Sequence, residues 1–576
     1  MSTLLLGRDL SIDTAPAGPT PLPPPPLGLV PVAHARMAVI LALFVLAVSA
    51  VIVRLTWLAL MPDTEMTASR YGVPSARGDI VDRNGVPLAQ TILVPSIGVQ
   101  PDKVIGDKRD LARRLAELMP EQTEAWYYSR LTSTEPFQYL KRHARPELAV
   151  AVNALGDPGI RIGREPERLY TQSATAAHVL GFTNAQGRGA MGMERFLDAR
   201  LTDGGMQGRP ASLSIDLRVQ SALESELGHA MVKHQALGAA GVILDVDTGE
   251  VMAMVSLPSF NPNHVRSLEG QFNNVTKGVY ELGSTFKPIT IAGAIEAGVV
   301  TSMQRRYDAV EPLAVGRFRI KDDHAQRRFL NVPETLVHSS NIVTARLADE
   351  MGEDRMKALF RSLGFHQPLD IEIERSNPRF SDARWSRARI MTSGYGHGVA
   401  VTPMHLAIAY AALVNGGILR PATMMKLAPS QVPEGTRVFS ESTSQRMRQL
   451  LRLIAVRGTA KRGDAAGYRV GAKTGTAERL SATGGYSKTV NVSTFAAAFP
   501  MDAPRYVVVA MLDSPKASAD TFGQTAAAWT VAPAVSRTIQ RTGPMLGVLP
   551  DPTRDIDLSD LQPLLWSPPG AEAAGE

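Results

Sequence analysis

The stretch AAGVILDVDTGEVMAMVSL, residues 239–257, decides the fold of the larger part of this chain. Two apolar runs flank the polar turn at residues 247–250, and this pattern predicts two neighbouring strands. Two more strand candidates, VNVSTFAAAFP (490–500) and RYVVVAMLD (505–513), stand near the other end of the chain. Because strands and helices are segregated rather than strictly alternating, we predict an α+β fold with an antiparallel sheet packed by helices.

Three helices are predicted around these strands. Apolar residues recur at helical spacing over residues 215–234, and residues 526–540 look like a closing helix despite Pro533. In VTPMHLAIAYAALVNGG (401–417), Thr402 can cap a helix and Pro403 suits its first turn. This is a packing helix, and we interpret His405 within it as a packing residue.

Composition narrows the classes of protein. With 576 residues, 44% hydrophobic and 20% charged, the chain should divide into two or three domains. The net charge is +6, but basic and acidic residues are interleaved, so nucleic-acid binding is not predicted. There are no cysteines and the 11 histidines lack zinc-like spacing, so neither disulfides, a metal nor another cofactor is implied.

A membrane span is predicted near the start of the chain. Residues 37–53 are apolar without a charge, and residues 55–61 extend the run past Arg54, which reaches the length of about 20 residues that a span needs. A cleaved signal peptide is the alternative, with small residues at 47–50, but the apolar run continues through that cut.

The flanks of the span indicate its orientation. Arg8 and Arg36 precede it, and Asp63 and Glu65 follow it, which favours an N-terminus inside the cell. Residues 15–31 form a proline-rich segment without a core-forming pattern, predicted to be disordered or polyproline-like.

The region that follows the span contains two local patterns and no convergent active-site chemistry. In RGDIVDRNGVPLA (77–89), an Asn84-Gly85 turn between apolar pairs predicts a small hairpin. A glycine-rich turn then leads to a helix predicted around residues 194–201.

The chemistry centres on ELGSTFKPIT, residues 281–290. A helix beginning near Ser284 would bring its hydroxyl and the Lys287 amine to one face. Gly283 permits a tight entry and Pro288 is tolerated near a helix start. Alone the pattern is weak, because a capping serine followed by a solvated lysine occurs by chance in many proteins.

Two further motifs strengthen the interpretation of Ser284 and Lys287 as reactive groups. HSSN supplies Ser339 and Asn341 before a helix, and KTGT supplies residues 473–476 within a predicted strand. The order S-x-x-K, S-x-N, K-T-G is that of the penicillin-recognising serine enzymes. A nucleotide-binding P-loop is excluded, because Ala472 stands where that motif requires glycine.

These residues suggest roles for an acyl-transfer site. Lys287 must be uncharged to accept the Ser284 proton, and lowering its pKa from ~10.4 to ~7 requires about 4 to 5 kcal/mol. Burial together with the second cation, Lys473, is expected to supply it. Ser339 can relay the proton toward the leaving amine, and Asn341 can hold a substrate amide.

The strand motif is expected to bind substrate. Lys473 and Thr474 would hold a carboxylate, and Gly475 would let a substrate backbone lie against the strand. The N–H groups of Ser284 and Thr476 would form the oxyanion pair.

At this point the sequence resembles the class B penicillin-binding proteins of the bacterial cell envelope. The resemblance covers most of the chain, including RGDIVDRNG, AHVLGFTN with GMERFLD, ILDVDTGEVMAMVSLPSFNPN and the three motifs. SGYGHGVAVTPMHLAIAYAALVNGG is most similar to the division-specific, FtsI-type branch. The proline-rich tail, which carries little positive charge, departs from the family pattern and puts cytoplasmic contacts in doubt.

The resemblance implies D,D-transpeptidation of peptidoglycan stem peptides and covalent inhibition by β-lactams. It also implies a membrane glycosyltransferase partner of the FtsW type, other division proteins, and a single-pass inner-membrane location with a periplasmic catalytic domain. Five regions are expected: tail 1–36, membrane anchor 37–61, elongated pedestal 62–210, transpeptidase domain 211–543 and tail 544–576.

Other functions stay open. They are an elongation-specific transpeptidase, a serine β-lactamase, and a β-lactam-binding sensor or inactive scaffold. A bifunctional class A enzyme is disfavoured, because no EDxxFxxH-like motif occurs between residues 63 and 210.

Overall fold

The computed structural model describes residues 29–60, 77–203, 209–316, 318–480 and 486–567. It divides into two compact units, Met1–Pro74 and Ser75–Glu576. In the first unit, helix α1 (Leu29–Leu60) contains the window Arg36–Val53 with a mean hydropathy of 2.7. This helix is long and apolar enough to cross a membrane, as predicted. Residues 15–28 of the proline-rich segment, and Asp63 and Glu65, lie outside the described residues.

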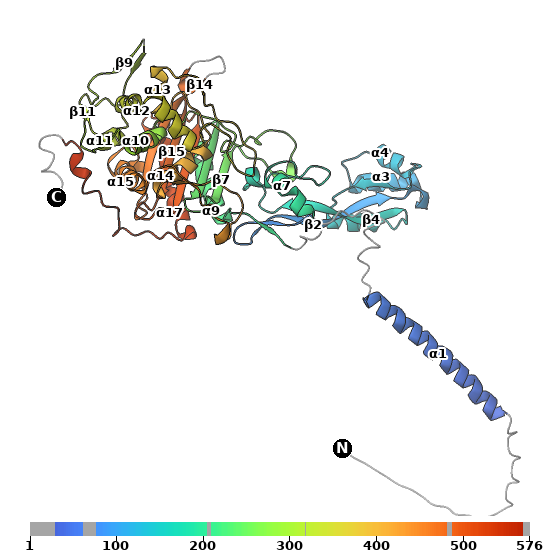
Figure 1. The fold of residues 1–576 in the computed structure, drawn as a ribbon. Coiled ribbons are helices and arrows are strands. Elements are labelled where there is room, and N and C mark those ends of the chain that lie inside the picture. The colour runs from blue at the N-terminus through green and yellow to red at the C-terminus, as the bar shows by residue number, and fades with distance from the viewer. Residues whose placement is uncertain (1–28, 61–76, 204–208, 317, 481–485, 568–576) are drawn as a thin grey trace, which may run out of the picture. The chain divides into compact units, whose positions relative to one another are not determined.

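The second unit begins with a sheet in the predicted pedestal (Figure 1). Its strands run in the order β3-β2-β1-β5, and β4 also pairs with β2. Strands β1 and β2 form the predicted hairpin, in which Asp82 Oδ1 accepts hydrogen bonds from the backbone N–H groups of Asn84 (2.7 Å) and Val86 (2.8 Å). The bounds are β1 (Ile80–Val81), β2 (Pro87–Val99), β3 (Gln138–Lys141), β4 (Ile160–Tyr170) and β5 (Ala211–Ser212).

The pedestal has two cores. Helices α3 (Lys108–Leu118), α4 (Glu124–Leu131) and α5 (Pro146–Asn153) enclose a small core with one end of strand β2. The other end of the sheet, including Ile80 and Leu88, belongs to the large core that continues into the predicted transpeptidase domain, called the catalytic domain below. The base of the pedestal is therefore fused to the catalytic domain by shared packing.

The helix predicted around residues 194–201 is two short helices. Helices α7 (Gly192–Phe196) and α8 (Asp198–Thr202) meet at Leu197 and follow the single-turn helix α6 (Ala177–Leu180). The break lets two carboxylates reach one guanidinium, since Arg77 donates to both Glu194 and Asp198 at 2.6 Å. A local pattern could not predict this, because Arg77 is more than a hundred residues away.

The catalytic domain is built on a five-stranded sheet in the order β14-β15-β16-β6-β7, with every neighbouring pair antiparallel. All the strands predicted from the sequence are present, and the α+β prediction is confirmed. The bounds are β6 (Gly238–Asp245), β7 (Val251–Leu257), β14 (Gly471–Leu480), β15 (Tyr486–Phe499) and β16 (Tyr506–Asp513).

Helices from both ends of this domain pack on the sheet (Figure 1). Helix α9 (Leu217–Lys233) contacts β6 and β7, and α17 (Ala532–Thr542) packs on α9. The predicted closing helix is in fact divided, because α16 (Ala527–Thr530) ends before Val531 and Pro533 lies in the first turn of α17. Proline at that position begins a helix more readily than it continues one.

Helix α14 (Pro403–Val414) agrees with its prediction. Thr402 caps it and His405 completes a capping box. Burial lowers the pKa of His405 to about 4, so its ring is neutral and packs as expected.

The remaining helices and short strands complete the domain. The helices are α10 (Lys287–Glu296), α11 (Val332–Val337), α12 (Asn341–Ser362), α13 (Arg387–Ser393) and α15 (Glu441–Arg457). The short strands are β8 (Tyr307–Asp308), β9 (Leu313–Val315), β10 (Phe318–Ile320), β11 (Phe329–Leu330), β12 (Ile418–Leu419) and β13 (Thr436–Arg437).

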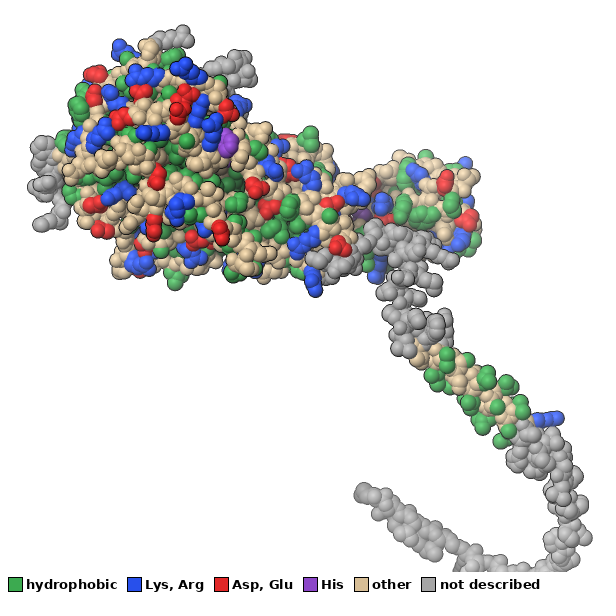
Figure 2. Space-filling view, viewed as in Figure 1, with side chains coloured by type: hydrophobic (Ala, Val, Ile, Leu, Met, Phe, Trp, Pro, Cys, Tyr) green, Lys and Arg blue, Asp and Glu red, His purple; other side chains and the backbone are tan. Residues whose placement is uncertain are grey.

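The C-terminal segment packs against the catalytic domain as far as it is described. Leu558 and Leu561 are buried, and Asp555 pairs with Arg452 at 2.7 Å. The predicted domain boundaries stay predictions. On the face shown in Figure 2, basic and acidic side chains are interspersed.

Candidate active site

The turn that carries Ser284 is a 3-10 helix and not the first turn of an α-helix. It spans Gly283–Phe286, and α10 begins directly afterwards at Lys287. Two contacts fix the turn: the Tyr410 hydroxyl donates to the Thr285 carbonyl oxygen at 2.9 Å, and Phe286 packs against Phe360 and Phe365. Ser284 is thus held on a rigid element.

Glycines let this turn approach strand β14 closely. Gly283 has φ +57°, and a Cβ there would lie 2.9 Å from the Thr476 carbonyl oxygen. A Cβ at Gly475 would lie 2.4 Å from the Leu282 carbonyl oxygen. The space beside Gly475 is therefore filled by the protein's own turn, whereas the sequence suggested room for a substrate backbone. A substrate-binding role for Gly475 stays a prediction.

Ser339 joins the two lysines of the motifs. The Nζ atoms of Lys287 and Lys473 each donate to Ser339 Oγ at 3.0 Å, and Lys287 Nζ also donates to the Ser339 carbonyl oxygen. Ser339 itself has φ +57°, in the left-handed region that residues other than glycine rarely adopt. The structure therefore brings one side chain from each of the three motifs together at a single hydroxyl.

Burial changes the charge of these amines. Both lysine side chains are fully buried. Burial lowers the pKa of Lys287 to about 7, against an opposing effect of Asp322 and Asp323. Burial first, and then repulsion by Lys287, lower the pKa of Lys473 well below its usual value. The sequence predicted a contribution of the second cation at Lys287, but burial is the dominant cause there.

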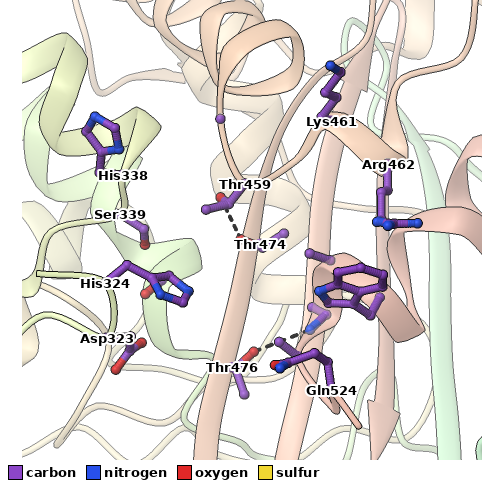
Figure 3. Close-up of a pocket in the computed structure, with 16 residues that line it drawn as sticks. Asp323, His324, His338, Ser339, Thr459, Lys461, Arg462, Thr474, Thr476 and Gln524 are labelled. Carbon is purple, nitrogen blue, oxygen red and sulfur yellow. Dashed lines mark hydrogen bonds between the residues drawn. The ribbon is translucent and has the colours of Figure 1, made fainter. Parts of the chain in front are cut away.

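A cavity of about 570 Å³ is lined in part by Ser339, the residue that both lysines contact (Figure 3). It brings together Ser284, Ser339, Thr474 and Thr476, one or more residues from each of the three motifs. The Thr474 hydroxyl donates to Thr459 Oγ1 at 2.9 Å. The other lining residues are Asp323, His324, His338, Gly458, Lys461, Arg462, Gln524, Ala526, Ala527, Ala528 and Trp529.

Similarity to known proteins agrees with this geometry. Residues 239–536 match the penicillin-binding protein transpeptidase domain, and residues 72–245 match the penicillin-binding protein dimerisation domain. The chain is 39% identical over 489 residues to the probable peptidoglycan D,D-transpeptidase FtsI of Caulobacter vibrioides, covering 83% of this chain and 82% of that protein. The chain belongs to the class B penicillin-binding proteins of the FtsI type.

Other relatives extend the likeness. Peptidoglycan D,D-transpeptidase FtsI of Escherichia coli is 30% identical, covering 84% of this chain and 88% of that one. Penicillin-binding protein 3 from Mycobacterium tuberculosis, solved in complex with aztreonam, is 24% identical with a TM-score of 0.66, covering 83% and 98%. A peptidoglycan synthetase from Bifidobacterium adolescentis also has a TM-score of 0.66, at 21% identity, covering 84% and 98%. These two solved structures have the same fold as this chain.

In this class B penicillin-binding protein, Asp322 is a residue that sequence reasoning missed. Its Oδ1 accepts from the backbone N–H groups of Asn341 (2.6 Å) and Ile342 (2.9 Å), and its Oδ2 accepts from Ser340 Oγ (2.7 Å). A carboxylate at the N-terminus of α12 satisfies free N–H groups and the helix dipole. Asp322 thereby fixes the turn that presents Ser339, and no short motif marks it.

Asn341 is not among the residues that line the cavity, although Ser339 of the same motif is. Its side-chain Nδ2 donates to the Lys321 carbonyl oxygen at 3.0 Å, so one side-chain donor is already engaged. The side-chain carbonyl oxygen is the group that can meet a substrate N–H. Its binding role stays a prediction.

Proposed function

We propose that this chain cross-links peptidoglycan stem peptides during septal cell-wall synthesis, through an acyl intermediate on Ser284. The observation that carries the proposal is the pair of buried amines on Ser339 Oγ, in the cavity wall that also holds Ser284. An amine whose pKa is about 7 can accept a proton at neutral pH.

In the acylation step, Lys287 in its neutral form takes the proton of the Ser284 hydroxyl. The Oγ atom then attacks the carbonyl carbon of the penultimate D-Ala. The N–H groups of Ser284 and Thr476 stabilise the oxyanion. The peptide C–N bond breaks as the proton passes from Lys287 through Ser339 to the leaving nitrogen, and the terminal D-Ala departs.

In the transfer step, an amine on a neighbouring stem peptide attacks the acyl-serine. It loses a proton to the site, a new amide forms, and Ser284 regains its proton. Lys473 and Thr474 hold the terminal carboxylate of the donor during acylation, and Asn341 holds its amide.

β-Lactams would acylate the same serine, because their strained amide mimics the donor's last peptide bond. Penicillin-binding protein 3 from Mycobacterium tuberculosis, which has the same fold, was solved in complex with aztreonam, and this supports the expectation.

The membrane placement is part of the proposal. Helix α1 anchors the chain in the inner membrane, with the N-terminus in the cytoplasm and the catalytic domain in the periplasm. Its partners would be a membrane glycosyltransferase of the FtsW type, which makes the glycan strands, and other division proteins.

Labelling with a fluorescent penicillin tests the nucleophile. We expect Ser284→Ala to abolish covalent labelling of the full-length protein, whereas Ser302→Ala, at an exposed site away from the cavity, keeps it. Labelling that survives Ser284→Ala would refute the assignment. Rapid hydrolysis of penicillin by the wild type would instead indicate a β-lactamase.

Imaging of depleted cells tests the division role. Filaments without septa are expected, whereas rounded cells would favour the elongation role. A sensor or inactive scaffold would release no terminal D-Ala from pentapeptide substrates.

A further inference from the structure

The active-site cavity has a basic wall that the mechanism above does not use. Lys461 and Arg462 lie in a 3-10 turn, Lys461–Gly463, between α15 and β14, and both line the cavity. Figure 3 shows them across the cavity from Asp323 and His324. Both are exposed, and within the described ranges neither makes an ion pair with a carboxylate. Two positive charges therefore face the cavity, and no carboxylate of the described residues contacts them directly.

The backbone beneath these two side chains is rigid. Ala460 and Gly463 are buried, and a Cβ at Gly463 would lie 2.1 Å from Phe495 Cζ. The next residue, Asp464, accepts from Arg452 Nη1 at 2.9 Å, and its carbonyl oxygen accepts from the Ser536 hydroxyl at 2.9 Å. The turn is clamped from both sides, so the two cations project from a fixed base.

An aromatic ring orients the guanidinium. The Cζ atom of Arg462 lies 3.6 Å from the centroid of the Trp529 ring, and Phe522 packs against the same indole with centroids 5.6 Å apart. Stacking engages the flat face of the guanidinium and leaves the N–H donors along its edge available. Those donors form the planar fork that binds a carboxylate with two parallel hydrogen bonds.

We propose that Lys461 and Arg462 form a subsite for a carboxylate on the peptide arm of the acyl donor, separate from the donor's terminal carboxylate. This inference rests on the proposed function, because the donor is the peptide that acylates Ser284. The terminal carboxylate is assigned to the hydrogen-bond donors of Lys473 and Thr474, so a second anionic group needs a separate set of donors. Asp323 on the opposite wall repels that group and gives the arm one orientation.

A pair of penicillins that differ by one side-chain carboxylate tests the subsite. Benzylpenicillin lacks this group and carbenicillin has it. Second-order rates of acylation are measured with the full-length protein in detergent, by competition with a fluorescent penicillin, and the readout is the carbenicillin-to-benzylpenicillin ratio. We expect Arg462→Gln to lower this ratio about five- to tenfold, and Lys461→Gln to lower it less, because a charge-assisted hydrogen bond is lost.

Two further variants separate a specific contact from general charge. Arg462→Lys keeps the charge without the fork and should give an intermediate ratio. Arg457→Gln removes one exposed charge at the end of α15, outside the cavity lining, and should leave the ratio as in the wild type. The inference is overturned if Arg462→Gln leaves the ratio unchanged, or if Arg457→Gln lowers it equally.

The two proposals fail in different ways. Failure of the subsite appears as an unchanged ratio while benzylpenicillin still acylates the wild type. Failure of the proposed function appears as labelling that does not depend on Ser284.

Discussion

Two buried charge clusters in this molecule are built in opposite ways. In the pedestal, Glu194 is fully buried and accepts hydrogen bonds from Arg77 Nε (2.6 Å) and Arg168 Nε (2.7 Å). In the catalytic domain, Lys287 and Lys473 are fully buried and meet at one neutral hydroxyl, Ser339. The pedestal pairs opposite charges, whereas the site brings like charges together.

The difference in charge pairing shows which cluster supports the structure and which is suited to chemistry. At Glu194, two guanidinium groups compensate the carboxylate for its loss of hydration, and the cluster braces the pedestal. At the lysines burial is not compensated in the same way, and the neutral amine is favoured. A buried amine without a matching counter-charge has a lowered pKa and can act as a base. Acyl transfer needs such a base to deprotonate the attacking hydroxyl.

The largest expected effect comes from removing the base. Lys287→Met replaces a buried amine with an apolar side chain of similar length. We expect the rate of penicillin acylation to fall about 10²- to 10⁴-fold, because the general base is lost. The free energy of unfolding should change little, because the desolvated amine leaves the core but its hydrogen bonds to Ser339 are lost with it. Stopped-flow acylation and urea unfolding measure the two quantities. A wild-type rate would contradict the role of Lys287.

Breaking the pedestal cluster should act on stability instead. Glu194→Gln leaves the buried Arg168 guanidinium without its anion and leaves Arg77 with Asp198 alone, and we expect the free energy of unfolding to fall by about 3 to 5 kcal/mol. Glu117→Gln is the control, because the Glu117 side chain is 61% exposed and its pair with Arg113 is worth little. Urea titration followed by tryptophan fluorescence reports both. Equal stabilities of the two variants would show that the cluster does not brace the pedestal.

The pH dependence of acylation tests whether the buried Lys287 amine, unlike the paired charges at Glu194, acts as a base. Lys287 must be neutral, so the rate should rise with pH and level off above a midpoint near its pKa of about 7. Below that midpoint the rate should fall about tenfold for each pH unit. Because the folded-state pKa lies below that of the unfolded chain, the unfolded chain binds more protons between these values, and Lys287 contributes stability that increases with pH there. A flat acylation profile from pH 5 to 8 would rule out this lysine as the base.

The smallest of these effects is expected at Asp322. Asp322→Asn keeps the shape but removes the charge that three donors share, so the turn before α12 should loosen. We expect acylation to slow by about tenfold, which corresponds to about 1.4 kcal/mol. Asp354→Asn, at an exposed position in α12, serves as the control for charge alone. If the two variants acylate equally fast, Asp322 does not position Ser339.

The elements of the fold follow from local patterns. The hairpin at Asn84-Gly85, the capped helix α14 and the strands β6, β7, β15 and β16 all agree with predictions from period, caps and turn residues. The predictions were wrong where distant contacts intervene. The break between α7 and α8 accompanies the contacts of Arg77 with Glu194 and Asp198, and contacts of Tyr410 and Phe286 hold the 3-10 turn at Ser284.

The sequence by itself determined the chemical type of the candidate site: the spacing and order of Ser284, Lys287, Ser339 and Lys473 predict an acyl-transfer site. Only the tertiary structure decided that the lysines lose their hydration, that Asp322 holds the second motif, and that Lys461 and Arg462 face Asp323 across one cavity. The physical reason is the distance along the chain over which each kind of interaction acts. Residue identity and local spacing encode chemical type and secondary structure, whereas burial and charge proximity arise only when segments distant in the chain pack together.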